Sequence, residues 1–227
     1  MTKDQPLLRL CAKLQAFFHK PFFTNPRTLF GLWTLLAVVA GLTKMAPHRH
    51  NNFLIFRGVF WHTIQKLSLY DFYPTEYNDH NHYGPIFSLV IAPFAVLPDA
   101  IGLLGWLVVL ALGMYYAVRR LPLEEGRQIF LYWFCAHELL TALQMQQFNI
   151  AIAAIIVGTF AAIERGREIT AAFLIVLGTF VKLYGVVGLA FFFFVKRKPR
   201  FILALIGWSV VCFVAPMIIS SPEYVIG

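Results

Sequence analysis

Long apolar runs, separated by short polar segments, follow one another along most of the chain. A bilayer core of about 30 Å requires about 20 consecutive apolar residues in helical form. The runs that meet or approach this length are 29–46, 101–118, 128–145, 149–163 and 201–219. The pattern therefore predicts an all-α fold, a polytopic bundle of transmembrane helices.

One apolar stretch is too short to span a membrane comfortably. Residues 85–97 contain Pro93, and Pro98 and Asp99 follow directly. A proline inside a helix removes a backbone hydrogen bond and bends or ends the helix. We therefore expect 85–97 to dip into the membrane and to return to the side from which it came.

A second stretch, 169–195, is long enough to span, but Lys182 interrupts it. Irregular backbone at membrane depth is tolerated only where protein or a water-filled cavity covers it. We therefore expect 169–181 and 184–195 to form a re-entrant hairpin of half-length helices, with Lys182 at its tip.

Composition agrees with a membrane protein. The chain has 227 residues, of which 59% are hydrophobic and only 13% charged, whereas about a quarter is charged in a typical soluble domain. The net charge of +8 does not indicate a nucleic-acid partner, because the basic residues form short clusters beside apolar runs. Scattered cysteines without pairing or metal spacing are interpreted as small hydrophobic residues: Cys11, Cys135 and Cys212.

The basic clusters predict how the chain crosses the membrane. They are the N-terminus, Arg119 to Arg127, Arg165 to Arg167, and "KRKPR" at 196–200. If all are cytoplasmic, each stretch between two clusters crosses an even number of times. The alternative is a bundle with an odd number of spans, in which one basic cluster does not lie on the cytoplasmic side.

This topology divides the chain into two predicted parts. Residues 1–28 are expected to be a basic amphipathic segment on the cytoplasmic face. Residues 29–227 are expected to be one multi-pass domain in the plasma (inner) membrane, with an outer loop at 47–84. The loop, the hairpin tip "QMQQFN" at 144–149 and Lys182 then all face outward.

The outer loop is rich in aromatic residues and ends in the polar segment "YPTEYNDHNHYGP" at 73–85. Loops of this length are usually functional or disordered, and the aromatic content argues against disorder. Phe53, Phe56, Phe60 and Ile64 recur at helical spacing, so part of the loop is expected to be a helix along the membrane interface. A zinc site built from the histidines is a weak alternative, because no HExxH or comparable spacing occurs.

Two ionisable residues lie inside apolar runs. Glu138 falls in the 128–145 span, and Lys182 separates two apolar half-helices. An unpaired charge at this depth costs about 3 kcal/mol or more, so such residues usually face a cavity and have a function. A mutual salt bridge is the structural alternative, and simple helix–helix contact is the alternative for the amides of 144–149.

Short motifs also follow one another in a characteristic order over about 48–200. They are "NNFLIF" at 51–56, "LYD" at 69–71, "HYGPIFSLVIAPFAVLP" at 82–98, "QQFN" at 146–149, "KLYG" at 182–185 and "KRKPR" at 196–200. In this order the chain resembles glycosyltransferase family 87, integral membrane enzymes of the C-type glycosyltransferase superfamily. The resemblance implies broken helices, a long outer loop after the first span, and sugar transfer from polyprenyl-phosphate donors, notably polyprenyl-phosphate mannose, at the outer face.

The chain departs from the family pattern at several positions. Asn52 stands where the family has an outer-loop acid, its expected catalytic base. Gln146 replaces a glycine, and Gly185 replaces a proline. The chain ends at "SSPEYVIG", directly after a span, whereas family members are longer, so we expect an N-terminal fragment.

In an inverting transfer, a carboxylate removes the proton of the acceptor hydroxyl, and fixed donors stabilise the departing phosphate. Since an amide cannot act as a base, the candidate carboxylates are Asp79, which we favour, Glu76 and Glu138. The candidate substrate-binding residues are Asn52, Asp71, His80, His82, Tyr83, Gln147, Asn149 and Lys182. Lys182 is expected to bind the lipid phosphate.

This chemistry calls for no metal or other cofactor. The expected partners are a polyprenyl-phosphate sugar donor, a lipid or glycan acceptor, and membrane lipids. Two other functions stay open from the sequence. Broken helices with intramembrane charges are also typical of secondary transporters, and Asn52 is compatible with a non-catalytic membrane partner on the same scaffold.

Overall fold

The computed structural model describes residues 20–46 and 49–226, and in these ranges the regular structure is entirely helical. The elements are α2 (Pro21–Thr24), α3 (Pro26–Lys44), α4 (Asn51–Gln65), α5 (Phe87–Ala95), α6 (Asp99–Arg119), α7 (Glu125–Phe134), α8 (Ala136–Gln144), α9 (Asn149–Glu164), α10 (Glu168–Val181), the 3₁₀ helix η1 (Leu183–Phe194), α11 (Lys198–Val214), the 3₁₀ turn η2 (Ala215–Ile218) and α12 (Pro222–Ile226). Most of the predicted N-terminal amphipathic segment lies outside the described residues.

Three described segments are long and apolar enough to cross a membrane: Pro26–Lys44, Asp99–Arg119 and Lys198–Ile218. They correspond to three of the predicted spans. The predicted span 149–163 is present as the shorter α9. The prediction of one continuous helix over 128–145 was wrong, because α7 ends at Phe134 and α8 begins at Ala136.

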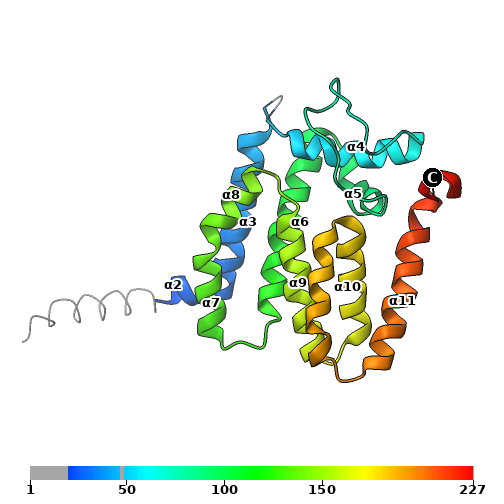
Figure 1. Cartoon of the computed structure of the whole chain (residues 1–227). Coiled ribbons are helices and arrows are strands. Elements are labelled where there is room, and N and C mark those ends of the chain that lie inside the picture. The colour runs from blue at the N-terminus through cyan, green and yellow to red at the C-terminus, as the bar shows by residue number, and fades with distance from the viewer. Residues whose placement is uncertain (1–19, 47–48, 227) are drawn as a thin grey trace, which may run out of the picture.

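The break at Cys135 is local. The Cys135 amide donates to the Leu131 carbonyl (2.9 Å), and the Cys135 carbonyl accepts from the Leu139 amide (2.8 Å). Helical hydrogen bonding therefore continues on both sides, and α8 stands on α7 in nearly the same direction (Figure 1). The two short helices together occupy the residues that the sequence assigned to one span.

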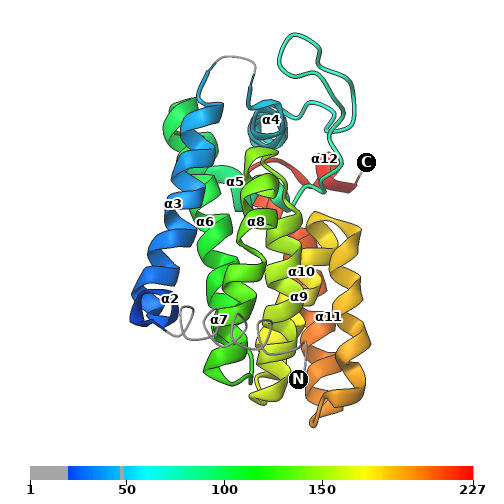
Figure 2. The same cartoon turned by 90° about the vertical axis from the view of Figure 1, so that its left-hand side faces the viewer.

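The upright helices form a row. α3 packs on α6, α6 on α9, α9 on α10, and α10 on α11, while α8 packs beside α3. Figure 2 shows the same row from the side. α10 and η1 pack against each other as the predicted hairpin, and their turn lies below α4 and α5 rather than level with the far ends of α3 and α6 (Figure 1).

The two ends of the row differ in composition. The connections at 120–124, 165–167 and 195–197 lie at one end together with α2 (Figure 1), and the basic clusters at 119–127, 165–167 and 196–200 lie in or beside these connections. We call this the basic end. α4, α5, the loop 66–86 and the α8–α9 connection lie at the opposite end, which we call the loop end. The described basic clusters therefore gather at one end of the row, while the membrane crossings themselves stay a prediction.

The loop end is covered by α4, which lies across the row (Figure 1). The helix predicted from the spacing of its apolar residues is present, with Phe53, Phe56 and Phe60 buried inside the protein and Ile64 exposed. Arg57 lies on the same helix. Its charge is balanced there by an ion pair with Asp99 at the start of α6, and its Nε donates to the Ala95 carbonyl (3.2 Å). α5 contacts α4 and α6 and stays at this end, as expected for a segment that does not cross.

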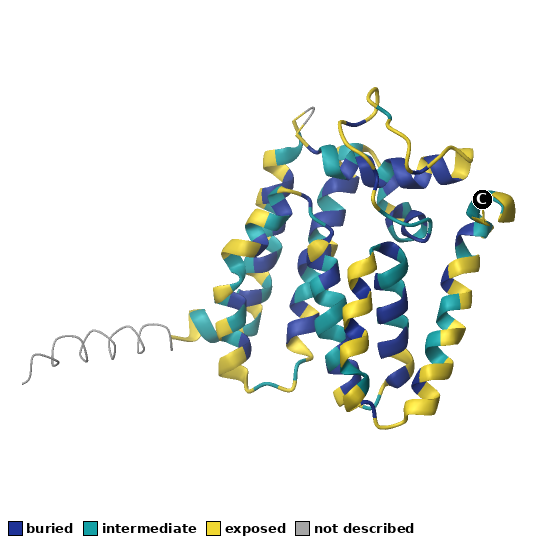
Figure 3. Cartoon of the chain, in the orientation of Figure 1, coloured by how far each residue is buried: buried dark blue, intermediate teal, exposed yellow. Residues whose placement is uncertain are grey.

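The outermost helix exposes apolar side chains along its length. Only Phe201 and Cys212 of α11 are buried, while Leu203, Ile206 and Val210 are exposed. Figure 3 shows exposed positions along the whole of this helix. An apolar face of this length suits contact with lipid and would be a liability in water.

Candidate functional site

A polar cavity of about 180 Å³ lies at the loop end, where four segments that are distant in sequence meet. α4, the loop 66–86, the α8–α9 connection and the turn between α10 and η1 each contribute to it. The lining residues are Asn52, Ile55, Phe56, Asp79, His80, His82, Tyr83, Gln147, Phe148, Asn149 and Lys182. Most of the residues predicted from the sequence to bind substrate therefore lie together, although they span about 130 positions of chain.

The turn between α10 and η1 holds the cavity's cation. Lys182 is extended, with φ −153° and ψ 126°, so α10 ends at Val181 and η1 begins at Leu183. The loop lies directly on this turn, because the Gly84 amide donates to the Val181 carbonyl (3.2 Å). A Cβ at Gly84 would be 2.2 Å from the Phe180 carbonyl oxygen, so only glycine permits this approach.

Lys182 is held by an amide and by aromatic rings. Its Nζ donates to Asn149 Oδ1 (3.1 Å) and lies 5.6 Å from the centre of the Tyr83 ring and 5.3 Å from that of Tyr184. In the described part of the chain it forms no ion pair. The alternative of a structural Glu138–Lys182 salt bridge was wrong, because the Lys182 ammonium binds the side chain of Asn149 and not that of Glu138.

The α8–α9 connection supplies the amides. Asn149 Nδ2 donates to Gln147 Oε1 (3.4 Å), which leaves the Asn149 carbonyl oxygen for Lys182. Asn52 of α4 donates from Nδ2 to the Met145 carbonyl (2.8 Å) and so ties α4 to the same connection. These contacts join three of the four segments that line the cavity.

The three candidate carboxylates lie in different places. Asp79 lines the cavity and is exposed, and its Oδ1 accepts a hydrogen bond from the His80 amide (2.8 Å). Glu76 lies outside the cavity and is bound through Oε2 to Nε2 of the buried His62 (3.1 Å). Glu138 lies on α8 in a neighbouring groove. Asp71, predicted to bind substrate, is exposed and is not among the lining residues.

Aromatic side chains form the inner wall of the cavity, and of these the sequence analysis had named only Tyr83 as a candidate for substrate binding. Phe148 lies with its ring centre 5.2 Å from Phe87 and 5.6 Å from Tyr83, and it stacks parallel to Trp106 at 6.1 Å. Phe56 meets Tyr83 edge to face at 5.1 Å. Burial raises the pKa of Tyr83 to about 12, so its phenol is a neutral hydrogen-bond donor at physiological pH. The helical spacing of Phe56 in α4 was the signal that could have placed it here.

A groove of about 330 Å³ adjoins the polar cavity. Apart from Glu138 it is lined mainly by apolar side chains of α3, α6, α8 and α9, and its lining residues are Trp33, Met114, Cys135, Glu138, Leu139, Ala142, Gln147, Asn149, Ile150 and Ala153. Gln147 and Asn149 line both spaces. The polar cavity and the apolar groove therefore meet at the side chains of Gln147 and Asn149.

Two of the departures from the family pattern have structural explanations. Gln146 has φ +49°, in the left-handed region where glycine is favoured, and its Nε2 donates to the carbonyls of Gln144 (2.9 Å) and Arg49 (3.4 Å). A Cβ at Gly185 would lie 2.1 Å from the carbonyl carbon of Gly178. A proline, which carries a Cβ, therefore does not fit where α10 and η1 touch.

Comparison with known families identifies the chain. Residues 81–226 match the model of glycosyltransferase family 87, which is well over half of the sequence. The chain belongs to glycosyltransferase family 87. It is accordingly a helical membrane protein of glycosyltransferase type. Comparison with curated proteins and with solved structures finds no match.

The matched range refines the resemblance seen in the sequence. It begins later and ends later than 48–200, so "NNFLIF" and "LYD" lie before it. The cavity residues inside the family match are His82, Tyr83, Gln147, Phe148, Asn149 and Lys182. The assignment of Asn52 to the position of the family's acid stays a prediction, as do the roles of Asp79 and Glu76. No group of three or more potential metal ligands gathers among residues 20–46 and 49–226.

Proposed function

We propose that this family 87 protein transfers a hexose, such as mannose, from a polyprenyl-phosphate donor to a hydroxyl of a lipid or glycan acceptor, with inversion at the anomeric carbon. The observation that carries the proposal is the polar cavity, which has a cation, Lys182, and a carboxylate, Asp79, among its lining residues. Inverting transfer to a hydroxyl needs a base for the acceptor and a positive partner for the departing phosphate.

The donor phosphate would bind at Lys182 and Asn149. A lysine ammonium forms charge-assisted hydrogen bonds with phosphate oxygens. Asn149 is the first residue of α9, and the N-terminus of a helix favours negative charge. Lys182 Nζ already points to Asn149 Oδ1, so a phosphate oxygen replacing that contact would lie at the start of α9.

The lipid part of the donor would lie in the adjoining groove. Its lining is largely apolar, and it meets the polar cavity at Gln147 and Asn149. A polyprenyl phosphate has the same division, with a charged head and a hydrocarbon tail joined at one atom. The two spaces therefore match the two parts of one donor molecule, and this chemistry needs no metal or other cofactor.

Asp79 would act as the base. Its carboxylate takes the proton of the acceptor hydroxyl as that oxygen attacks the anomeric carbon. The bond from the anomeric carbon to the phosphate oxygen breaks, and the phosphate leaves with the electron pair. Glu76 is less suited because its carboxylate already binds His62. Glu138 is less suited because it lies in the groove assigned to the lipid.

We place the reaction at the outer face of the plasma (inner) membrane. The support is electrostatic, since the basic end carries the arginine and lysine clusters that mark a cytoplasmic side. The cavity lies at the opposite end, where a sugar donor and a lipid or glycan acceptor would meet outside the cytoplasm.

The test is sugar transfer from a radiolabelled polyprenyl-phosphate mannose by purified protein in lipid nanodiscs. We expect Asp79→Asn to lower the turnover rate by roughly 100-fold or more, the usual value of a general base. Glu76→Gln is the matched control, since Glu76 lies outside both the cavity and the groove, and it should retain most of the activity. Loss of activity only in Glu138→Gln would instead place the base in the groove. Full activity of Asp79→Asn would overturn its role, and absence of transfer by the parent protein with every donor tried would favour a non-catalytic partner.

A further inference from the structure

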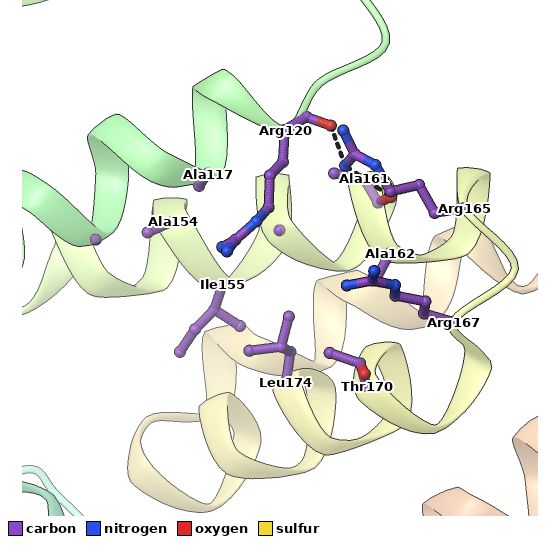
Figure 4. A pocket seen from close by; sticks show the side chains of 12 residues that line it. Ala117, Arg120, Ala154, Ile155, Ala161, Ala162, Arg165, Arg167, Thr170 and Leu174 are labelled. Carbon is purple, nitrogen blue, oxygen red and sulfur yellow. Dashed lines mark hydrogen bonds between the residues drawn. The ribbon is translucent and has the colours of Figure 1, made fainter.

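A second cavity lies at the basic end, far from the proposed catalytic site. It has a volume of about 370 Å³ and is bounded by α6, α9 and α10 (Figure 4). The lining residues are Gly113, Ala117, Arg120, Ala154, Ile155, Gly158, Ala161, Ala162, Arg165, Arg167, Thr170 and Leu174. None of them lines the polar cavity or the groove beside it. The glycosyl transfer proposed for the loop end does not use this cavity.

The rim of the cavity is positively charged. Arg120 follows the last turn of α6, and Arg165 and Arg167 belong to the α9–α10 connection. The ion pairs at this end join other arginines to the glutamates: Arg119 to Glu125 (3.8 Å), Arg127 to Glu124 (3.6 Å) and Arg197 to Glu168 (3.2 Å). In the described part of the chain, none of the three rim arginines pairs with a carboxylate. Their charge is therefore available to an anion from outside the protein.

The rim arginines differ in what they already bind. Arg165 donates from Nη1 to the carbonyls of Arg120 and Ala161, so it joins the ends of α6 and α9. The side chains of Arg120 and Arg167 make no comparable bond among the described residues. Figure 4 shows both extending from different elements over the cavity. Arg165 therefore has a structural role, while Arg120 and Arg167 present unused donors.

The floor of the cavity is apolar and built from small residues. Gly113 and Ala117 of α6 and Ala154 and Gly158 of α9 contribute to it. A Cβ added at Gly113 would meet no atom within 4 Å. The groove thus has open space along its apolar part, wide enough for atoms that the protein itself does not supply.

We propose that this cavity binds an anionic phospholipid of the leaflet at the basic end, with its phosphate between Arg120 and Arg167 and an acyl chain along the floor. Basic pockets between transmembrane helices on the cytoplasmic side suit such headgroups. A free phosphate would leave the apolar floor unused, and an uncharged lipid would leave the arginines unused. The combination of both features is what selects an anionic amphiphile.

The test measures lipid retention by native mass spectrometry of the purified full chain in detergent. The probes are dioleoyl phosphatidylglycerol, dioleoyl phosphatidylcholine, inorganic phosphate and undecaprenyl phosphate, each titrated separately. We expect phosphatidylglycerol to bind more tightly than phosphatidylcholine and than inorganic phosphate. Equal binding of the two phospholipids, or binding of inorganic phosphate as tight as that of phosphatidylglycerol, would overturn the proposal. Undecaprenyl phosphate also has a proposed site at the loop end, so its binding is compared in the arginine variants: if Arg120→Ala and Arg167→Ala weaken it more than they weaken phosphatidylglycerol binding, the proposal is overturned.

Two kinds of variant separate the headgroup from the chain. Arg120→Ala and Arg167→Ala should each weaken phosphatidylglycerol binding roughly fivefold, the effect expected for one surface guanidinium. Gly113→Leu keeps all the arginines and fills the floor, so it should weaken binding of the phospholipid; a Cβ at this position meets no atom within 4 Å. Arg127→Ala is the control, since this arginine lies at the same end outside the cavity. Parent-like retention by both the arginine variants and Gly113→Leu would refute the site.

Discussion

Individual residues of the polar cavity were largely predictable because each is unusual for its surroundings. A lysine inside an apolar run, or a row of amides at a hairpin tip, stands out against a lipid-facing background. The sequence could not show which candidate side chain is already bound to another residue of the protein. His62 looked like one more loop histidine, yet it is buried in α4 and binds Glu76. That contact joins residues 14 positions apart, and it removes Glu76 from the cavity.

Lys182 gives the sharpest prediction at this scale. Lys182→Met removes the ammonium but keeps an unbranched side chain over the Tyr83 ring. A hydrogen bond to a charged group contributes about 1.5–3 kcal/mol, so donor affinity should fall roughly 10- to 100-fold. The measurement is binding of a polyprenyl-phosphate sugar, with thermal unfolding as a check on folding.

Lys44→Met is the matched control for this variant. Lys44 ends α3 near the loop end and does not line the cavity. Its replacement should leave donor affinity unchanged. If both variants bind the donor like the parent protein, Lys182 is not the phosphate partner.

At the scale of elements, the hairpin of α10 and η1 shows what periodicity can and cannot reveal. The interruption at Lys182 predicted two half-length helices, and this was confirmed. The 3₁₀ form of η1 over 12 residues was not predictable, because such runs rarely exceed three or four residues. Close contact between Gly178 and Gly185 explains why glycine is needed, but only the packed structure brings these residues together. The break at Cys135 likewise has no signal in the apolar pattern.

We predict that Gly185→Ala destabilises the hairpin and, through it, the cavity. The added Cβ would lie 2.1 Å from the Gly178 carbonyl carbon, so α10 and η1 must move apart. Overpacking of this kind costs about 1–3 kcal/mol, which should lower the thermal midpoint of the purified protein measurably. Sugar transfer should fall as well, because Lys182 sits on the displaced turn.

Gly207→Ala is the corresponding control on α11. A Cβ there meets nothing within 4 Å, and alanine favours a helix over glycine by about 1 kcal/mol. This variant should match or exceed the stability of the parent. An unchanged midpoint for Gly185→Ala would mean that the two glycines do not pack as described.

At the scale of the whole molecule, the distribution of charge was the most informative part of the sequence. Four basic clusters predicted an even number of crossings between them, and the described clusters do gather at one end. The charge pattern alone could not predict the cavity, because its walls come from segments about 130 positions apart. Charge counting placed those segments on one side of the membrane, but only packing shows that Asn52, Tyr83 and Lys182 line the same space.

The orientation can be tested directly with single cysteines in a chain whose native cysteines are replaced by serine. A cysteine at the exposed Asn78, at the loop end, should react with a membrane-impermeant maleimide added to intact cells. One at Lys198, at the basic end, should react only after permeabilisation. The opposite labelling pattern would place the cavity on the cytoplasmic side and refute the proposed site of reaction.

Gln147 and Asn149 line both the polar cavity and the apolar groove. A donor that fills both spaces has its tail dissolved in the bilayer before it binds, so it meets the protein by diffusion in two dimensions. Its effective concentration is then a mole fraction of the surrounding lipid rather than a molarity in the assay volume. Adding unlabelled lipid at fixed amounts of protein and donor should therefore slow the reaction by surface dilution, although the bulk concentrations of protein and donor stay the same.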